Sequence, residues 1–413
     1  MTGVTSETLT AALLEAQSDD GLRVLMFSPH SHSGWHHYSV ALCNALVKHP
    51  RVARVHYLML LREQRPFAGA EELDILDPAV ERSYVAPPED LPRARRGMLF
   101  LKNAASWWWK LWRRDYDVLH VQSLSFDIVR DLTLLLLHGL RLSGIPIVRT
   151  LHELVMPFRE PQRHDRRARW RSRLELLLSP NVIVHDAAMR DDLNREFRTR
   201  RRTVAIIPNG NWLMFRRYLP AGYDEGQIYR GGGPPRVLFL GIKRHKGLAA
   251  FLEAWRMVKA DGHGFQALLT GEIGDADLRA EAERLPGLEV RAGYVPNEEL
   301  WRCFARSSFV VMPYLSGTTS AAVHLAYAFK RPVITSDLAC FRDVVIPGET
   351  GIVISKADPV ALKNAIIELG NDRRRCRAMG EAGFGLESSS AYDWTTIADA
   401  TVRVYLDARQ RRR

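Results

Sequence analysis

The amino-acid sequence predicts an α/β protein with two Rossmann-like domains that face each other across a cleft. Short apolar strand patterns alternate with helical patterns along almost the whole chain, and several strands end at a glycine. A glycine- and proline-rich run at residues 231–235 divides these elements into two sets of similar size. Alternating strands and helices favour parallel sheets covered on both faces, with ligands bound at the strand ends between the domains.

The first set forms the expected N-terminal domain, residues 21–218, which follows a polar, acidic and flexible extension at residues 1–20. A polar, proline-rich stretch that reaches about residue 92 shows no strand pattern. Helical patterns include 97–113 and 128–142. The expected strands are 22–27, 52–61, 117–122, 146–151, 182–185 and 204–208.

The second set forms the expected C-terminal domain, residues 236–388, after an interdomain linker at 219–235. Residues 389–413 combine a helical pattern with a basic tail. The expected strands of this domain are 237–240, 266–270, 288–291, 309–312, 333–335 and 351–354.

Composition limits the class of partner. The 413 residues carry a net charge of +11, which favours anionic partners. No zinc finger, RNA-recognition signature or helix-turn-helix supports nucleic acid as that partner. The four cysteines lie far apart, which fits a reducing compartment, and no apolar run approaches the roughly 18 residues of a spanning helix. We therefore expect a cytoplasmic protein.

A basic loop follows the first strand of the second set, within Val237–Leu248. Lys243, Arg244 and Lys246 crowd into four positions between an apolar strand pattern and an apolar helical pattern. A helix N-terminus offers unpaired N–H groups, and fixed cations add charge-assisted hydrogen bonds, so this loop suits a diphosphate. The alternative is a solvated basic turn without a ligand.

The order of short motifs along the chain carries a family resemblance over roughly residues 23–406. The motifs are Asp117–His120, Thr150–Glu153, Ile207–Gly210, the basic loop, Gly271–Glu272, Tyr294–Pro296, Pro313–Asp337, Asp343–Val353 and Asp358–Ile366. This order resembles the GT-B glycosyltransferases of the large retaining group 4 type. The resemblance implies the GT-B fold, with a C-terminal helix that returns to the N-terminal domain.

The resemblance also implies roles for individual residues. Arg244 and Lys246 match the pair that grips the donor diphosphate and stabilises its departure, and His152 matches a histidine near the transferred sugar. These three are the candidate catalytic residues. Further donor-binding candidates are Gly34, Gly241, Gly271, Val295, Pro296, Gly317, Thr318, Thr319 and Ser320.

The sequence departs from the family at its Glu-x7-Glu signature. Gly317 stands where the first glutamate contacts the sugar hydroxyls, and Leu325 stands where the second contacts the ribose. A small, hydroxyl-rich loop at a helix N-terminus can still hold phosphate through backbone N–H groups and hydroxyls. The departure leaves a second interpretation open, in which the chain is a non-catalytic binding or scaffold subunit.

Histidines cluster after the first strand. A metal site is conceivable because neutral imidazoles bind zinc, but no carboxylate or cysteine lies close by in the sequence, and the family needs no metal. We expect no metal and no cofactor beyond the nucleotide-sugar co-substrate, and we assign the cluster to the acceptor side of the cleft. The acceptor-side candidates are His32, Trp35, His36, His37 and Asn209.

A tryptophan-rich basic segment, residues 98–114, contains the sequence Trp-Trp-Trp-Lys-Leu-Trp-Arg-Arg. Helical spacing places Leu101, Ala105, Trp108 and Trp112 on one face, which Trp107 and Leu111 widen. This face either packs on the N-terminal sheet or docks on an anionic membrane. A second arginine-rich segment at 159–173 supports the membrane alternative.

The leading functional prediction is transfer of a sugar, with retention, from a nucleotide-diphosphate donor to a hydroxyl acceptor such as a lipid-linked or polysaccharide precursor. We further hypothesise peripheral attachment to the inner membrane face.

Overall fold

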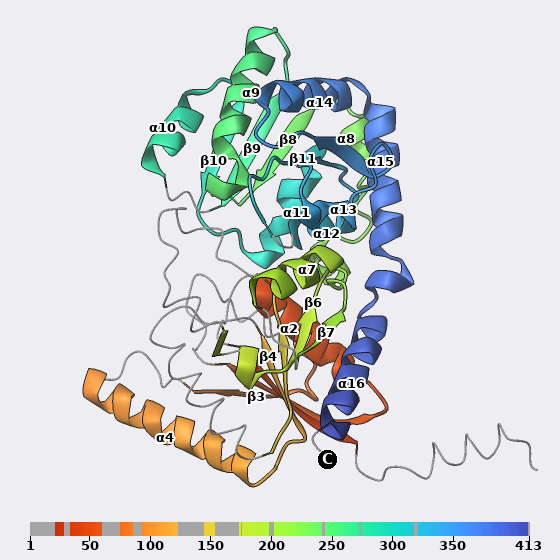
Figure 1. The fold of residues 1–413 in the computed structure, drawn as a ribbon. Helices are drawn as coiled ribbons and strands as arrows, with labels where there is room; N and C mark the ends of the chain where they lie inside the picture. Colours follow the sequence, from red (N-terminus) through yellow and green to blue (C-terminus); the bar gives the residue numbers. More distant parts are fainter. Residues whose placement is uncertain are drawn as a thin grey trace, which may run out of the picture.

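The computed structural model describes residues 21–28, 34–59, 75–85, 92–122, 144–152, 173–174, 176–197, 202–241, 244–271, 275–317 and 321–411. These residues form two parallel sheets with helices on both faces of each (Figure 1). The expectations at 1–20, 128–142 and most of 159–173 lie outside the described residues. The fold class predicted from the sequence is confirmed.

The N-terminal sheet has the strand order β3-β2-β1-β4-β5-β6-β7 in the described residues, and neighbouring strands run parallel. The order reverses between β1 and β4, which is where open α/β sheets bind ligands, beyond the carboxyl ends of the strands. The strands are β1 (Leu22–Ser28), β2 (Val52–Met59), β3 (Glu81–Tyr84), β4 (Val118–Gln122), β5 (Ile147–Thr150), β6 (Asn181–Val184) and β7 (Thr203–Ile206).

The C-terminal sheet has the order β10-β9-β8-β11-β12-β13, again parallel throughout the described strands. Its order reverses between β8 and β11, so the basic loop after β8 lies at the second switch point. The strands are β8 (Arg236–Leu240), β9 (Gln266–Gly271), β10 (Leu288–Ala292), β11 (Phe309–Met312), β12 (Val333–Ser336) and β13 (Gly351–Ile354).

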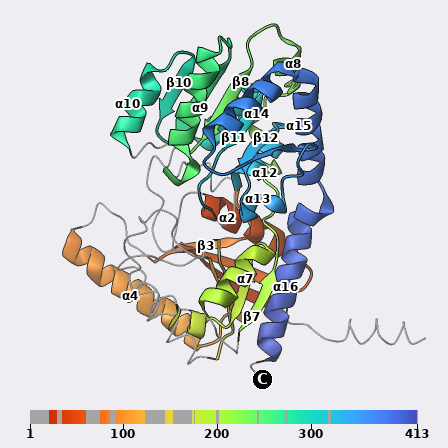
Figure 2. The same ribbon diagram turned by 45° about the horizontal axis from the view of Figure 1, so that its top comes forward.

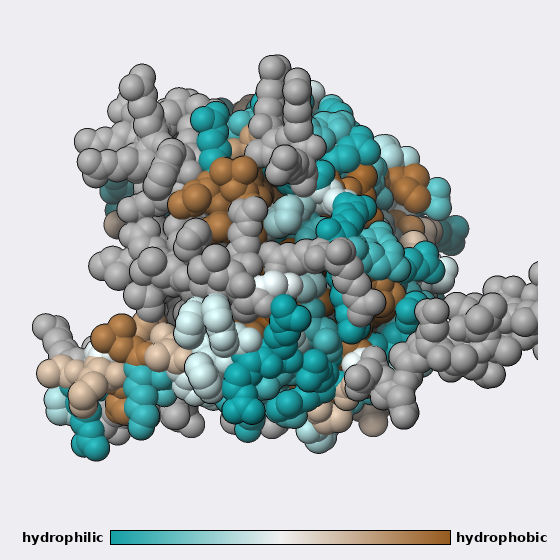
Figure 3. All heavy atoms as spheres, turned by 60° about the horizontal axis from the view of Figure 1, so that its bottom comes forward, coloured by the Kyte–Doolittle hydropathy of each residue, from teal (hydrophilic) through white to brown (hydrophobic). Residues whose placement is uncertain are grey.

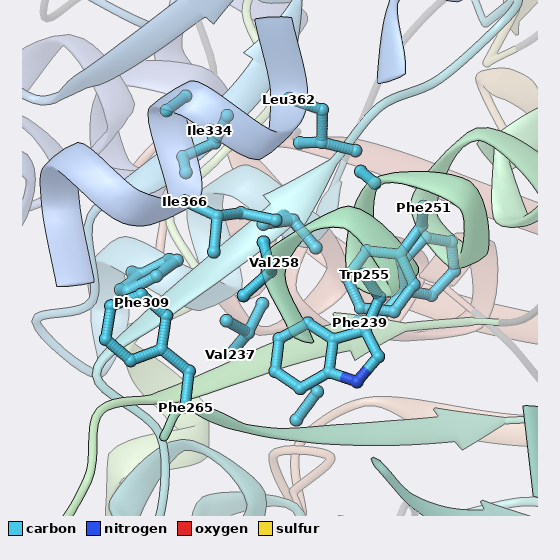
Figure 4. Packing of buried hydrophobic residues seen from close by; sticks show 14 of the residues in the cluster. Val237, Phe239, Phe251, Trp255, Val258, Phe265, Phe309, Ile334, Leu362 and Ile366 are labelled. Carbon is cyan, nitrogen blue, oxygen red and sulfur yellow. The ribbon is translucent and has the colours of Figure 1, made fainter. Parts of the chain in front are cut away.

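Helices cover the two sheets and complete their cores (Figures 1 and 2). The cluster in Figure 4 joins strands β8, β9 and β11 to α9 and α14, so the strand that leads into the basic loop is firmly held. The helices are α2 (Gly34–Leu46), α4 (Arg93–Trp112), α7 (Ala187–Glu196), α8 (Gln227–Arg230), α9 (Leu248–Ala260), α10 (Ala276–Arg284), α11 (Asn297–Ala305), α12 (Ala321–Ala328), α13 (Ala339–Arg342), α14 (Pro359–Asn371), α15 (Arg373–Glu387) and α16 (Trp394–Gln410), with 3₁₀ turns η1 (Leu213–Tyr218), η2 (Arg244–Lys246) and η3 (Ser390–Tyr392).

The C-terminal helix returns to the N-terminal domain, as the resemblance implies. α15 lies along the C-terminal sheet and α16 along the N-terminal one (Figure 1). Ile397, Val402 and Tyr405 of α16 are buried in the same cluster as the α2 core. The hydroxyl of Tyr405 also lies 2.6 Å from Nδ1 of His120. The passage of the chain from α15 to α16 therefore joins the C-terminal domain to the N-terminal domain. The exact domain boundaries stay predictions.

Two expectations need correction. β3 pairs with β2 inside the stretch expected to carry no strand. Its sequence, Glu-Arg-Ser-Tyr, lacks an apolar alternation because it is an edge strand, and it is held in part by the ion pair between Glu81 and Arg54.

The second correction concerns α4. Of the predicted apolar face, Trp107 and Leu111 at its border are the side chains buried on the sheet, whereas Leu101 and Trp112 are exposed. Leu101 is 63% exposed and Trp112 is 47% exposed. Sequence spacing identifies an apolar face on a helix, but only the packing decides which part of it is buried.

Candidate active site

The basic turn after β8 is shaped by two glycines and fastened to the neighbouring strand end. Gly241 and Gly247 have φ angles of +77° and +78°, which favour glycine. A Cβ on Gly247 would collide with the carbonyl oxygen of Pro313. The N–H of Leu315 donates to the carbonyl of His245 at 2.7 Å, so η2 is attached to the segment after β11.

Lys246 is the described cation of this turn, since Arg244 is described by its backbone alone. The Lys246 ammonium lies 3.5 Å from the carbonyl of Leu240 and 5.3 Å from the centre of the Tyr314 ring. A hydrogen bond of that length is weak. Within the described residues Lys246 therefore keeps donors for an anionic ligand at the start of α9.

Three glycines end adjacent strands at the same edge of the C-terminal sheet. Gly241 follows β8, Gly271 is the last residue of β9, and Gly293 follows β10. All three have a positive φ. The N–H of Gly293 donates to the carbonyl of Gly271 at 3.0 Å. Val295 and Pro296, expected to line the nucleotide base, lead from this edge into α11 and are half-buried. The donor-binding candidates Gly241, Gly271, Val295 and Pro296 therefore lie along one edge of the C-terminal sheet, which we call the donor rim.

The turn before α12 lies beside that rim. A Cβ on Gly317 would lie 3.6 Å from Sγ of Cys340, which is an ordinary contact distance. Thr318, Thr319 and Ser320 lie outside the described residues. Leu325 is 6% exposed and belongs to the hydrophobic cluster under α12, so the second family glutamate is replaced by a core residue.

The N-terminus of α2 faces this turn from the other domain. A Cβ on Gly34 would lie 3.5 Å from the Trp212 ring and 3.9 Å from Cβ of Ala321, which starts α12. Two helix N-termini therefore approach each other across the cleft, and both favour negative charge. Trp35 continues α2 and its ring stacks on His152 with centroids 6.2 Å apart.

The other acceptor-side candidates diverge. His36 is buried, with Nδ1 2.9 Å from the Tyr57 hydroxyl. Nε2 of His37 lies 3.1 Å from the amide nitrogen of Asn297, across the domain junction. Oδ1 of Asn209 is buried with no hydrogen-bond partner among the described residues. His32 lies outside that part of the chain.

Metal-ligand geometry is absent from the described ranges, where no three His, Cys, Asp or Glu side chains come together to hold an ion. His36 and His37 take different partners, as their position on a helix requires. The expectation that no metal or cofactor is needed stays a prediction.

His152 is 3% exposed and lies in a network that sequence reasoning missed. Its Nε2 is 2.9 Å from Oε1 of Gln122, and its Nδ1 is 2.9 Å from Nε2 of His185. The Tyr38 ring packs edge-on against it at 4.7 Å. His185 occupies the end of β6 next to the end of β5, and only parallel pairing of these strands reveals that neighbour.

A buried hydrogen bond between a histidine and a carboxylate supports the domain junction. Nδ1 of His324 on α12 lies 2.8 Å from Oε2 of Glu387, and the backbone N–H of Trp212 donates to Oε1 at 2.6 Å. Glu387 has no exposed surface. The three elements that meet here are the chain entering η1, the donor-side helix α12 and the end of α15. No motif in the sequence predicts the contact between His324 and Glu387.

The fold is shared with solved glycosyltransferases. Sucrose-phosphate synthase from Thermosynechococcus elongatus superposes with a TM-score of 0.69 at 19% identity, covering 93% of this chain and 98% of that one. The Anabaena protein HepE, solved with UDP-glucose, gives a TM-score of 0.68 at 15% identity, covering 93% and 99%. Two facing Rossmann-like domains with a returning C-terminal helix therefore define a GT-B protein.

Family models identify both halves. Residues 33–210 match Glycosyltransferase Family 4, and residues 234–372 match Glycosyl transferases group 1. The chain therefore carries two glycosyltransferase domains, one in each half.

Relatives of known function cover part of the chain. A phosphatidyl-myo-inositol mannosyltransferase of Mycobacterium leprae is 31% identical over 41% of this chain and 46% of its own length. A glycogen synthase of Mycobacterium tuberculosis is 24% identical over 56% and 55%. The chain thus spans about half the length of these curated relatives.

Proposed function

We propose that this protein transfers a sugar from a nucleotide-diphosphate donor to a hydroxyl acceptor, with retention, on a lipid-linked or polysaccharide precursor. The observation that carries the proposal is the meeting of three anion-favouring features at the cleft. These are the Lys246 turn, the N-terminus of α12 and the N-terminus of α2. The similarity to a lipid mannosyltransferase supports a lipid-linked acceptor, and the HepE complex supports a nucleotide-sugar donor.

The proposed mechanism is front-face departure of the nucleoside diphosphate. Arg244 and Lys246 stabilise the negative charge that develops on the leaving group, while the acceptor hydroxyl attacks from the same face. No protein nucleophile takes part. The two domains exclude water when they close, which limits hydrolysis of the donor.

Substitution of the turn cations tests this mechanism. Arg244→Ala and Lys246→Ala should each preserve the thermal unfolding temperature and lower turnover by about 100- to 1000-fold, because each removes a charge that acts mainly in the transition state. Turnover is measured by release of nucleoside diphosphate from a panel of nucleotide sugars. Near-normal turnover in either variant would remove the turn from the mechanism.

A thermal-shift screen identifies the donor before any acceptor is known. A nucleotide sugar present at 100 times its dissociation constant stabilises the folded protein by about 2.7 kcal/mol. UDP-sugars are the first donors to test, given the HepE complex. The same screen with and without EDTA tests the expectation that donor binding needs no metal.

A non-catalytic scaffold is the second candidate function, and Leu325 favours it. A core leucine at the position of the ribose-binding glutamate removes one donor contact from the family pattern. A purified protein that binds nucleotide sugars but neither transfers nor hydrolyses them would support the scaffold.

Peripheral attachment to an anionic membrane through α4 is the proposed location of the reaction. The support is an exposed apolar stripe on a helix anchored by Trp107 and Leu111. The helix contains no acidic residue, and its indoles and cations suit the headgroup level. In Figure 3, α4 lies at the left edge with apolar side chains beside hydrophilic ones. The stripe comprises Met98, Leu101, Trp109 and Trp112, which are 66%, 63%, 55% and 47% exposed.

Vesicle flotation tests the attachment. The wild-type protein should float with vesicles rich in phosphatidylglycerol at low salt, and the double variant Trp109→Ala/Trp112→Ala should not. Val360→Ala is the matched control, since Val360 is 51% exposed on α14 of the other domain. Equal flotation of both variants would contradict a role for α4. Among the described helices, none is long and apolar enough to cross a membrane.

A further inference from the structure

The carbonyl next to His185 fixes where that ring carries its proton. Nδ1 of His185 lies 3.0 Å from the carbonyl oxygen of Ile207. A carbonyl oxygen can only accept a hydrogen bond, so Nδ1 must carry the hydrogen. The ring is 6% exposed and sits at the end of β6, where β5 and β7 flank the strand.

The other nitrogen of His185 is an acceptor. Burial lowers the pKa of His185 to about 4, although the hydrogen bond to the Ile207 carbonyl acts in the opposite direction. A neutral imidazole with hydrogen on Nδ1 has a lone pair on Nε2. That lone pair faces Nδ1 of His152 at 2.9 Å. His152 must therefore donate from Nδ1.

Gln122 does not change this assignment. Oε1 of its amide lies 2.9 Å from Nε2 of His152. The contact is satisfied if Nε2 also carries a proton, or if the amide is turned over so that its nitrogen donates. In both arrangements His152 keeps the hydrogen on Nδ1.

Aromatic rings leave these two imidazoles little freedom to rotate. The Tyr38 ring packs edge-on against His152 at 4.7 Å and against His185 at 5.3 Å. Trp35 stacks on the outer side of His152. The orientation of His152 thus depends on His185 at Nδ1, on Gln122 at Nε2 and on the rings around it.

We propose that His185 is a positioning residue, which holds His152 as the Nδ1–H form so that Nε2 is the nitrogen presented to the transferred sugar. The role in transfer rests on the proposed function. A donor hydroxyl that reaches Nε2 takes the place of the Gln122 amide. The donor site of the C-terminal domain is then complemented by His152 and His185, which follow two adjacent strands of the N-terminal domain.

Nitrogen-15 NMR of histidine-labelled full-length protein tests the pair without any substrate. His152 is assigned by the signals that disappear in His152→Gln. The wild type should show a protonated Nδ1 on His152, and His185→Gln should keep it, because an amide can accept from His152 and donate to Ile207. His185→Leu should lose it. An unprotonated Nδ1 on His152 in the wild type would overturn the proposal.

Kinetics of UDP-glucose hydrolysis separate positioning from a structural role. His185→Leu should lower kcat by about 10- to 100-fold with KM within about twofold, since a misplaced catalytic group affects the reaction more than binding. His185→Gln should restore kcat to within about threefold. His56→Gln is the matched control, a buried histidine on β2 outside the site, and should leave kcat unchanged.

The outcomes distinguish this inference from the proposed function. If the NMR result is as expected but no nucleotide sugar is transferred or hydrolysed, the proposed function fails and the imidazole pair stands. If hydrolysis occurs and His185→Leu has the same kcat as His56→Gln, the positioning role is wrong.

Discussion

The two walls of the cleft are built in different ways. The C-terminal wall is shaped by backbone, with three glycines of positive φ at adjacent strand ends and a turn that carries Lys246. The N-terminal wall is shaped by side chains, with His152 held by Gln122 and His185. A backbone wall suits a diphosphate, which all nucleotide-diphosphate sugars share, whereas a side-chain network can be adapted to one sugar or acceptor.

Lowering the pH should destabilise the protein through two buried histidines of the N-terminal domain, and this is the largest effect we expect. His120 and His185 are fully buried, and burial lowers their pKa values from 6.5 to about 3 and about 4. The unfolded chain therefore binds more protons than the folded one below pH 6.5. The stability from these two groups is complete well above pH 6.5 and is lost as the pH falls, by about 2.3 kcal/mol per unit on average between pH 6 and pH 4.

Denaturant titrations at several pH values measure this slope, to which carboxylates add their own part at the acid end. The variant His120→Gln removes one of the two protons, so its slope should be smaller by about 1.4 kcal/mol per unit. An unchanged slope would mean that His120 is already protonated in the folded protein.

Loss of the histidine–carboxylate contact at the junction should be the next largest effect. His324→Leu leaves the carboxylate of Glu387 fully buried with the Trp212 N–H as its described partner. Removing one member of a buried pair costs about 3–5 kcal/mol. Urea unfolding measures the loss, and the double variant His324→Leu/Glu387→Leu should recover part of it. A double variant no more stable than the single one would show that the unpaired charge is not the cause.

The backbone wall is tested at Gly247. Alanine there needs a strained φ of +78° and meets the Pro313 carbonyl, so we expect a loss of about 1–3 kcal/mol and weaker donor binding. Gly233→Ala is the control, because its Cβ would meet nothing within 4 Å and its φ is ordinary. Equal stability of the two variants, measured by thermal unfolding, would show that the turn adapts.

Gly317→Glu should have the smallest effect on stability, within about 0.5 kcal/mol, because its Cβ finds only ordinary contacts. It restores the first family glutamate and should change the order of preference among nucleotide sugars in the thermal-shift screen. An unchanged order would place the sugar away from this turn.

The sequence was most informative where backbone geometry sets the structure. Strand ends, glycines and the basic turn follow local rules, so both sheets were predicted correctly as elements, while the returning helix was implied by the family resemblance. The roles of the site residues stay predictions. β3 was missed because edge pairing, rather than apolar alternation, forms it.

The side-chain wall could not be read from the sequence. His185 contacts His152 because β5 and β6 are neighbours, and Glu387 contacts His324 because α15 ends beside α12. Such partners are dozens of residues apart, and no spacing rule connects them. The sequence also left open which part of the apolar face of α4 is buried, because that depends on the sheet on which the helix packs.

The most direct test of the backbone wall as a diphosphate site is calorimetric titration with nucleoside diphosphates. Lys246→Ala should weaken binding by about 10- to 100-fold, the loss of one charge-assisted hydrogen bond. Lys356→Ala, an exposed lysine after β13, should bind like the wild type. Equal affinities for Lys246→Ala and the wild type, or no binding of any nucleoside diphosphate, would contradict the account.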